Sequence, residues 1–125
     1  MSGSRFLLDT NAIVSLLAGD TALAGHLNAA EWVGISVISQ IEFLAFSGLS
    51  TDDQMLFTEF LQRVEVVGLP SDDTVLLDEI IRMRRQYGIK VPDAIIAAMA
   101  VTMSATLVTA DKGFNKILGL PILAL

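Results

Sequence analysis

Residues 90–114 read KVPDAIIAAMAVTMSATLVTADKGF, and this stretch decides the fold. Pro92 suits the first position of a helix, and the residues after it are apolar almost without interruption as far as Met103. A helix that is apolar almost all round belongs in the core of a protein. Residues 106–109, which are apolar or β-branched, then predict a short strand.

The rest of the chain repeats this alternation of helix and strand. Further strands are expected at 5–8, 33–37, 64–67 and 121–124. Further helices are expected at 12–17, 21–30, 39–46, 51–63 and 70–87, with a short one at 113–118. The alternation predicts an α/β fold in which helices cover both faces of a mainly parallel sheet.

The composition is that of one domain without a membrane segment. A chain of 125 residues suits a single core, which we place at 6–125, with residues 1–5 as a disordered or tag-derived N-terminus. The hydrophobic fraction is 53% and the mean hydropathy is +0.62, but charged and polar residues interrupt every stretch of about 20 residues. The N-terminal apolar run stops at Asp9 and is too short for a secretory signal. A cytoplasmic protein is therefore expected, and its apolar surplus predicts a homodimer, a partner protein or both.

Residue counts exclude several kinds of site. The chain has no cysteine, which rules out disulfides and cysteine-ligated zinc, and its single histidine argues against sites with two or more imidazoles. The formal net charge is −6, whereas nucleic-acid binders usually carry a positive face. Any basic patch must therefore be local, or metal ions must supply the positive charge. Half of the eight Lys and Arg residues form a cluster that is either a phosphate-binding patch or a solvated helix face: Arg82, Arg84, Arg85 and Lys90.

Four acidic residues lie where strands end or helices begin. Asp9 follows the first strand and Asp111 closely follows the strand at 106–109. Glu42 and Asp93 lie near the starts of helices. In open parallel sheets the ligand binds beyond the carboxyl ends of the strands, so we expect these carboxylates to share one rim. Two unit charges about 4 Å apart repel by roughly 4 kcal/mol at an effective dielectric near 20. Such a cluster requires cations or bound protons, which predicts a site for hard metal ions that act on phosphates.

Each of these acids also has an ordinary structural explanation. Ser39 and Glu42 have the spacing of a capping box, and Asp93 suits the first turn of a helix. Asp9 and Asp111 are common turn residues. The set is harder to explain in this way, because the neighbours of Glu42 are apolar and the helix after Asp93 belongs in the core. Six other acidic residues are expected to be structural or solvating: Asp52, Asp53, Glu59, Glu65, Asp72 and Asp73.

The chain resembles PIN domains, and specifically VapC-type toxin ribonucleases, in motifs that include these four acids. The matching pieces, in order, are LDTN at 8–11, SxxE at 39–42, KVPDAIIAA at 90–98 and TADKGF at 109–114. The resemblance extends from Phe6 to Leu125 and implies a three-layer α/β/α sandwich with a central parallel sheet. It also implies an acidic pocket for one or two Mg²⁺ or Mn²⁺ ions and an endoribonuclease whose cleavage of RNA is restrained by a cognate antitoxin.

The resemblance carries roles over to individual residues. Four residues fall on the acidic positions of the family, as catalytic and metal-binding residues: Asp9, Glu42, Asp93 and Asp111. Three fall on its accessory polar positions, expected to contact the substrate or orient a carboxylate: Thr10, Asn11 and Thr109. Two basic residues near Asp93 in the sequence are candidates for gripping a phosphate of the RNA: Arg85 and Lys90.

Phosphodiester hydrolysis is the reaction that this set predicts. Asp9, Asp93 and Asp111 would hold the metal, and Glu42 would bind a second ion or position the attacking water. Since no histidine belongs to the set, a carboxylate or bulk solvent would act as general base. A catalytically silent binding or scaffold module with the same fold stays open as the alternative, and the apolar surplus favours it. An aspartyl phosphotransfer domain is disfavoured, because such domains usually have two adjacent acids early in the chain.

Overall fold

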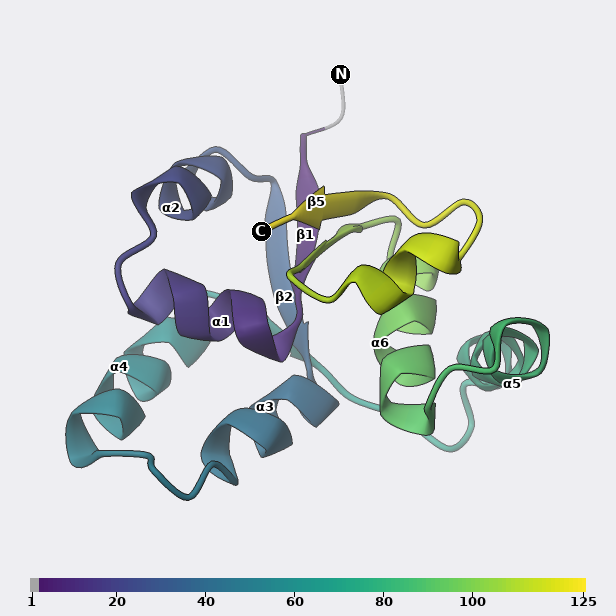
Figure 1. Ribbon diagram of the computed structural model, residues 1–125, viewed down its shortest axis with the longest axis horizontal. Helices are drawn as coiled ribbons and strands as arrows, with labels where there is room; N and C mark the ends of the chain where they lie inside the picture. Colours follow the sequence, from purple (N-terminus) through teal and green to yellow (C-terminus); the bar gives the residue numbers. More distant parts are fainter. Residues whose placement is uncertain (1–2) are drawn as a thin grey trace.

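Within residues 3–125, which the computed structural model describes, five parallel strands form the centre of the molecule (Figure 1). Their order in the sheet is β3-β2-β1-β4-β5. The strands are short: Arg5–Leu8 (β1), Trp32–Ser36 (β2), Glu65–Val67 (β3), Thr106–Thr109 (β4) and Ile122–Ala124 (β5). The strand order reverses direction between β1 and β4, and such a switch point opens a crevice at the carboxyl edge of a parallel sheet.

Within residues 3–125, six α-helices cover the two faces of the sheet. Their bounds are Thr10–Leu17 (α1), Thr21–Asn28 (α2), Val37–Leu44 (α3), Thr51–Leu61 (α4), Thr74–Tyr87 (α5) and Val91–Thr102 (α6), and a 3₁₀ helix follows at Lys112–Lys116 (η1). Helices α1, α2 and α4 lie on one side of the sheet, and α5 and α6 lie on the other (Figure 1). The predicted three-layer α/β/α sandwich with a parallel sheet is confirmed.

Successive side chains of the central strands pack into two separate hydrophobic cores. In β1, Leu7 packs with residues of α5 and α6, whereas Phe6 and Leu8 pack with residues of α1 to α4. In β4, Leu107 and Val108 divide between the cores in the same way. This follows from the period of two along a strand, and it explains why strands buried on both faces read as continuous apolar runs.

The register brings the carboxyl ends of the central strands to the same edge. Leu8 pairs with both Ile35 of β2 and Val108 of β4. The next amide along the chain, that of Asp9, donates to the carbonyl oxygen of Val108 across 3.0 Å. Because α1 starts directly after β1 and α3 directly after β2, both helices leave the sheet at this edge.

Some helix boundaries differ from the expected ones because other residues act as caps. Helix α3 begins at Val37 rather than Ser39, since the Ser36 hydroxyl accepts from the amide of Ile38 across 3.0 Å. Ser39 is therefore a buried residue inside the helix. Helices α1 and α5 also have starts that differ from the expected ones, at Thr10 and Thr74.

The first described residues already belong to the fold. Arg5 opens β1, and its Nε donates to the carbonyl oxygen of Met103 across 2.9 Å. The Arg5 guanidinium also stacks over the ring of Trp32, 4.7 Å from the centroid. The segment expected to be disordered or tag-derived therefore does not reach Arg5, and Met1 and Ser2 lie outside the described residues. Across residues 3–125, no helix is both long enough and apolar enough to cross a membrane.

Candidate active site

Asp9 lies at the centre of the carboxyl edge. It follows β1, caps α1 and is only 7% exposed. Its Oδ1 accepts from the backbone amide of Thr10 across 2.8 Å. Its Oδ2 accepts from the hydroxyl of Thr109 at 2.8 Å and from Nδ2 of Asn11 at 3.2 Å. These donors compensate the burial of a charged group and fix the orientation of the carboxylate.

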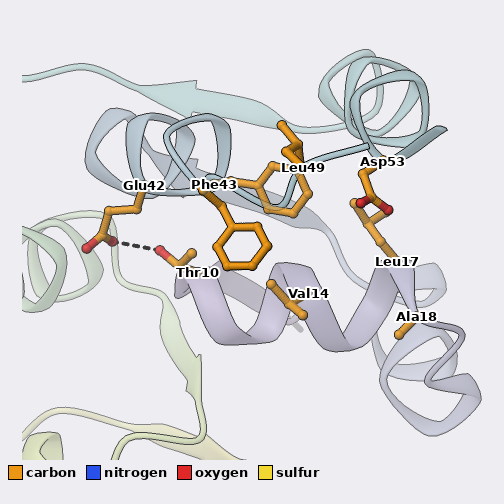
Figure 2. Close-up of a pocket in the computed structure, with 9 residues that line it drawn as sticks. Thr10, Val14, Leu17, Ala18, Glu42, Phe43, Leu49 and Asp53 are labelled. Atoms are coloured by element: carbon orange, nitrogen blue, oxygen red, sulfur yellow. Dashed lines mark hydrogen bonds between the residues drawn. The ribbon is translucent and has the colours of Figure 1, made fainter. Parts of the chain in front are cut away.

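Glu42 joins this site from α3. The hydroxyl of Thr10 donates to Oε1 of Glu42 across 2.7 Å, and Figure 2 shows this bond at one end of a groove. The capping-box explanation for Glu42 is wrong, because Ser36 caps α3 and the Glu42 carboxylate bonds to α1 instead. The exposed end of Glu42 therefore belongs to the same edge as Asp9.

Asp111 is connected to the same edge through backbone amides that donate to side-chain oxygens. Its amide donates to the hydroxyl oxygen of Thr109 across 3.0 Å, and the neighbouring amide of Ala110 donates to Oδ1 of Asn11 across 2.9 Å. The Oδ1 of Asp111 accepts from the amide of Gly113 across 2.8 Å. A Cβ atom at residue 113 would lie 3.0 Å from that oxygen, so glycine leaves room for the Asp111 carboxylate.

Asp93 stands apart from these hydrogen bonds. It lies half-buried in the first turn of α6, where the helix macrodipole favours an anion. Asp93 and Asp111 line the same pocket of about 360 Å³. The other residues that line this pocket are Gly88, Ile89, Lys90, Gly113, Phe114 and Lys116.

The four carboxylates influence one another electrostatically. Burial raises the pKa of Asp9; the hydrogen bonds from Thr109 and Thr10 lower it, and the charges of Glu42 and Asp111 raise it further. Burial also raises the pKa of Asp93, and the charges of Asp111, Asp9 and Glu42 add to this rise. Lys90 opposes the rise at Asp93. The charges of the other predicted acids therefore act on Asp9 and on Asp93 at the carboxyl edge.

The donor set suits a hydrated divalent ion rather than a closed metal cage. In the part of the chain that the structure describes, no three Asp, Glu or His side chains are grouped closely enough to hold an ion directly. Mg²⁺ is usually bound through one or two carboxylates and keeps several of its waters, so it does not require such a group. Burial raises the pKa of both Asp9 and Asp93, and the charges of neighbouring carboxylates raise it further. A bound cation would relieve the part of the rise that comes from repulsion. The residues present thus fit a partly water-mediated ion.

Comparison with known protein families identifies the fold that carries this edge. The model described as PIN domain matches residues 6–119. The chain belongs to the PIN domain family. The matched part of the chain includes all four acids, strands β2 to β4 and all of β1 except Arg5. Comparison with the sequences of curated proteins gave no significant match.

Solved structures of toxin–antitoxin complexes contain similar PIN domains. A chain of a toxin–antitoxin complex from Klebsiella pneumoniae is 25% identical, with a TM-score of 0.75 over 94% of this chain and 95% of that one. A chain of VapBC2 from Rickettsia felis, bound to a promoter DNA fragment, is 25% identical, with a TM-score of 0.78 over 97% and 98%. A chain of VapBC-5 from Mycobacterium tuberculosis, at 20% identity, shares the fold with a TM-score of 0.69 over 98% and 99%. The predicted resemblance to VapC-type PIN domains is confirmed.

The basic residues of this PIN domain are arranged differently from the expected patch. Lys90 lines the pocket that contains Asp93, whereas Arg85 is exposed on α5 and is not among the lining residues. Lys116 lines the pocket although the sequence does not single it out. Lys112 and Lys116 both lie close to Asp111 in the sequence, but only Lys116 lines the pocket. Closeness to Asp111 in the sequence therefore could not distinguish Lys116 from Lys112.

A second hollow, an apolar groove of about 350 Å³, begins at Thr10 and Glu42 on the carboxyl edge. Thr10 and Glu42 are at one end of it, and Leu17, Ala18 and Asp53 are at the other (Figure 2). Its remaining lining residues are Val14, Phe43, Phe46 and Leu49. The carboxyl edge is therefore flanked by a groove that is mainly apolar and by a pocket that carries charge.

Proposed function

We propose that this PIN domain is a metal-dependent endoribonuclease, the toxin of a type II toxin–antitoxin pair, which hydrolyses RNA phosphodiesters. The observation that carries the proposal is the meeting of four carboxylates at the carboxyl edge of the sheet, where neighbouring negative charges add to the pKa rise that burial causes at Asp9 and Asp93. Such a concentration of negative charge would not favour a polyanionic substrate unless cations were bound with it.

Asp9, Asp93 and Asp111 would hold one or two Mg²⁺ or Mn²⁺ ions, directly or through waters. When bound, the ion would supply Lewis-acid stabilisation of the phosphoryl oxygens and activation of water. Thr109 and Asn11 hold Asp9 in position, since both donate to its Oδ2. These two residues therefore act as positioning residues for a carboxylate that is itself nearly inaccessible to solvent.

Glu42 would orient the attacking water and accept its proton. Its Oε1 is held by Thr10, and among the described residues its Oε2 has no hydrogen-bond donor. A carboxylate held through one oxygen can use the other as a base. The single histidine does not compete for this role, since His26 lies on α2 with its ring 6.4 Å from that of Phe6.

The apolar groove supports an antitoxin as the partner. The solved chains from Klebsiella pneumoniae and Rickettsia felis belong to a toxin–antitoxin complex and to VapBC2. The groove contains exposed apolar side chains, among them Val14 at 53% and Phe46 at 66%. A partner segment bound there would cover Thr10 and Glu42 and would restrain the site, because both residues line the groove. This partner and the cytoplasmic location of such a pair are parts of the proposal, as is a homodimer.

The direct test is cleavage of RNA by the purified chain after any partner has been removed. We expect cleavage of a labelled RNA panel with Mg²⁺ or Mn²⁺, loss of cleavage in EDTA, and loss of at least about 100-fold in Asp93→Asn, in line with the several kcal/mol a metal ion supplies. The matched control is Asp78→Asn, which removes the same charge from an exposed position on α5.

Two results would count against the nuclease. Cleavage by Asp93→Asn at the parental rate would remove the carboxylate set from the mechanism. Tight binding of RNA or of a partner without cleavage under any metal condition would favour the alternative, a catalytically silent PIN module. That alternative is supported by the exposed apolar surface alone.

A further inference from the structure

Two lysines line the pocket beside Asp93. Lys90 comes from the segment between α5 and α6, and Lys116 comes from the end of η1. Both side chains are exposed. In the described part of the chain neither ammonium group has a carboxylate within 4.0 Å or a hydrogen-bond acceptor. Two lysines that are not engaged by the fold are available to an anion.

The two segments that carry these lysines are held in place by α5. Nη1 of Arg84 donates to the carbonyl oxygen of Ile89 across 2.6 Å, next to Lys90 in the chain. The Tyr87 hydroxyl accepts from the amide of Leu118 across 3.1 Å, just after η1. The last turn of α5 therefore anchors both lysine-bearing segments before any ligand arrives.

The charges of the pocket suit a phosphate group close to a metal. Lys90 and Lys116 contribute two positive charges, and Asp93 and Asp111 contribute two negative charges, so the lining is neutral as it stands. A divalent ion near the aspartates would make it net positive. A volume of about 360 Å³ lies within the roughly 300–1,000 Å³ typical of small-ligand sites.

The groove on the other side of the site offers no such charge. Its lining includes Glu42 and Asp53 and contains no lysine or arginine. A polyanion that approaches the carboxyl edge would therefore be attracted over the pocket and repelled over the groove. This contrast in charge favours the pocket over the groove for a bound polyanion.

We propose that Lys90 and Lys116 bind the backbone phosphate next to the scissile linkage, as positioning residues of an RNA subsite in this pocket. The proposal rests on the nuclease function proposed above. It assigns a role to Lys116, and it places the RNA strand over the end of η1 and the start of α6, away from the apolar groove.

The test compares Lys90→Gln and Lys116→Gln with Lys112→Gln, which removes an exposed lysine of η1 that does not line the pocket. Binding of a short single-stranded RNA is measured at several salt concentrations, and cleavage kinetics are measured in parallel. We expect each pocket variant to raise the KM about 3- to 10-fold with a smaller change in kcat, as one lost charge-assisted contact of about 1 kcal/mol implies. The slope of log K against log salt should fall by about 0.7 for each lysine.

A neutral linkage locates the phosphate. A methylphosphonate, carried on a 2′-O-methyl nucleotide so that the linkage is stable, is moved stepwise along the RNA. It should weaken binding to the parental protein most at the position adjacent to the cleaved bond, and should have little further effect in Lys116→Gln. Lys116→Arg should restore binding, because it keeps the charge.

Several outcomes overturn the proposal. If Lys90→Gln and Lys116→Gln bind and cleave RNA as Lys112→Gln does, the subsite proposal is wrong, whereas the proposed nuclease function is unaffected. The same holds if the lysine variants lose a protein partner but keep RNA affinity. Absence of cleavage by the parental protein, in contrast, counts against the nuclease function itself.

Discussion

The hydroxyl of Thr10 donates to Oε1 of Glu42 across 2.7 Å and thereby joins the first turn of α1 to α3, although the residues are 32 positions apart in the sequence. Thr10 also presents its amide to Asp9. One residue thus couples a buried carboxylate to an exposed one. If Glu42 handles the attacking water, this bond determines where the water is held relative to Asp9.

Thr10→Val should lower the cleavage rate clearly while changing the free energy of unfolding only slightly. The bond is exposed, so its loss should cost about 1 kcal/mol of unfolding free energy or less. We expect kcat to fall by about 10-fold, because the Glu42 carboxylate would no longer be held. Urea unfolding and single-turnover cleavage check the two effects. Thr10→Ser keeps the hydroxyl and should restore activity; equal loss in both variants would contradict this explanation.

The metal-free protein should lose stability as the pH rises above the ordinary aspartate pKa of 3.8, because the pKa values of Asp9 and Asp93 are raised. The folded state holds these protons more tightly than the unfolded chain, so their contribution is present below 3.8 and is lost as the pH passes the raised values. Asp20 acts in the opposite sense: hydrogen bonds lower its pKa, and its contribution is lost only below 3.8.

Melting temperatures between pH 4 and pH 8 in EDTA measure this dependence. Asp93→Asn should flatten the decline, whereas Asp78→Asn removes an equal charge elsewhere and should leave it in place. Mg²⁺ should raise the melting temperature at pH 7 more than at pH 4.5, since a cation and bound protons relieve the same repulsion. A decline that is identical in both variants would contradict a raised pKa at Asp93.

Gly113→Ala should reduce cleavage with little effect on folding. The added Cβ would lie 3.0 Å from Oδ1 of Asp111, so the carboxylate must shift by a few tenths of an ångström. Since geometry at a reacting site is sensitive to such shifts, we expect a loss of several-fold in kcat. Gly68→Ala is the matched control, because nothing lies within 4 Å of its Cβ position. Equal activity of the two variants would show that Asp111 tolerates the shift.

Val14→Lys should weaken binding of a partner in the apolar groove without weakening cleavage. Val14 is 53% exposed and lines the groove on α1, so a lysine there is tolerated by the fold and places a charge against an apolar segment. Titration of the antitoxin against activity measures the effect, and we expect inhibition to weaken by about 10-fold or more. Val75→Lys, at a position 71% exposed on α5, is the control. Unchanged inhibition would place the partner elsewhere.

Much of the fold follows from local patterns in the sequence. The apolar stretch after Pro92 predicts a core helix, and residues 94–100 are buried. The alternation of strands and helices predicts the parallel sheet, and the position of Asp9 after a buried strand predicts its place at the carboxyl edge. These features depend on period, on helix signals and on short-range order along the chain, which are properties of neighbouring residues.

Contacts across the chain needed the tertiary structure. A serine three residues before Glu42 predicts a cap, but the fold places Thr10 within reach of the carboxylate and places Ser36 at the helix start. Lys112 and Lys116 are alike in the sequence, and only the path of η1 brings Lys116 to the pocket of Asp93. Local sequence thus determined the elements and their order, whereas the side-chain partners depended on strand register and helix packing, which join residues distant along the chain.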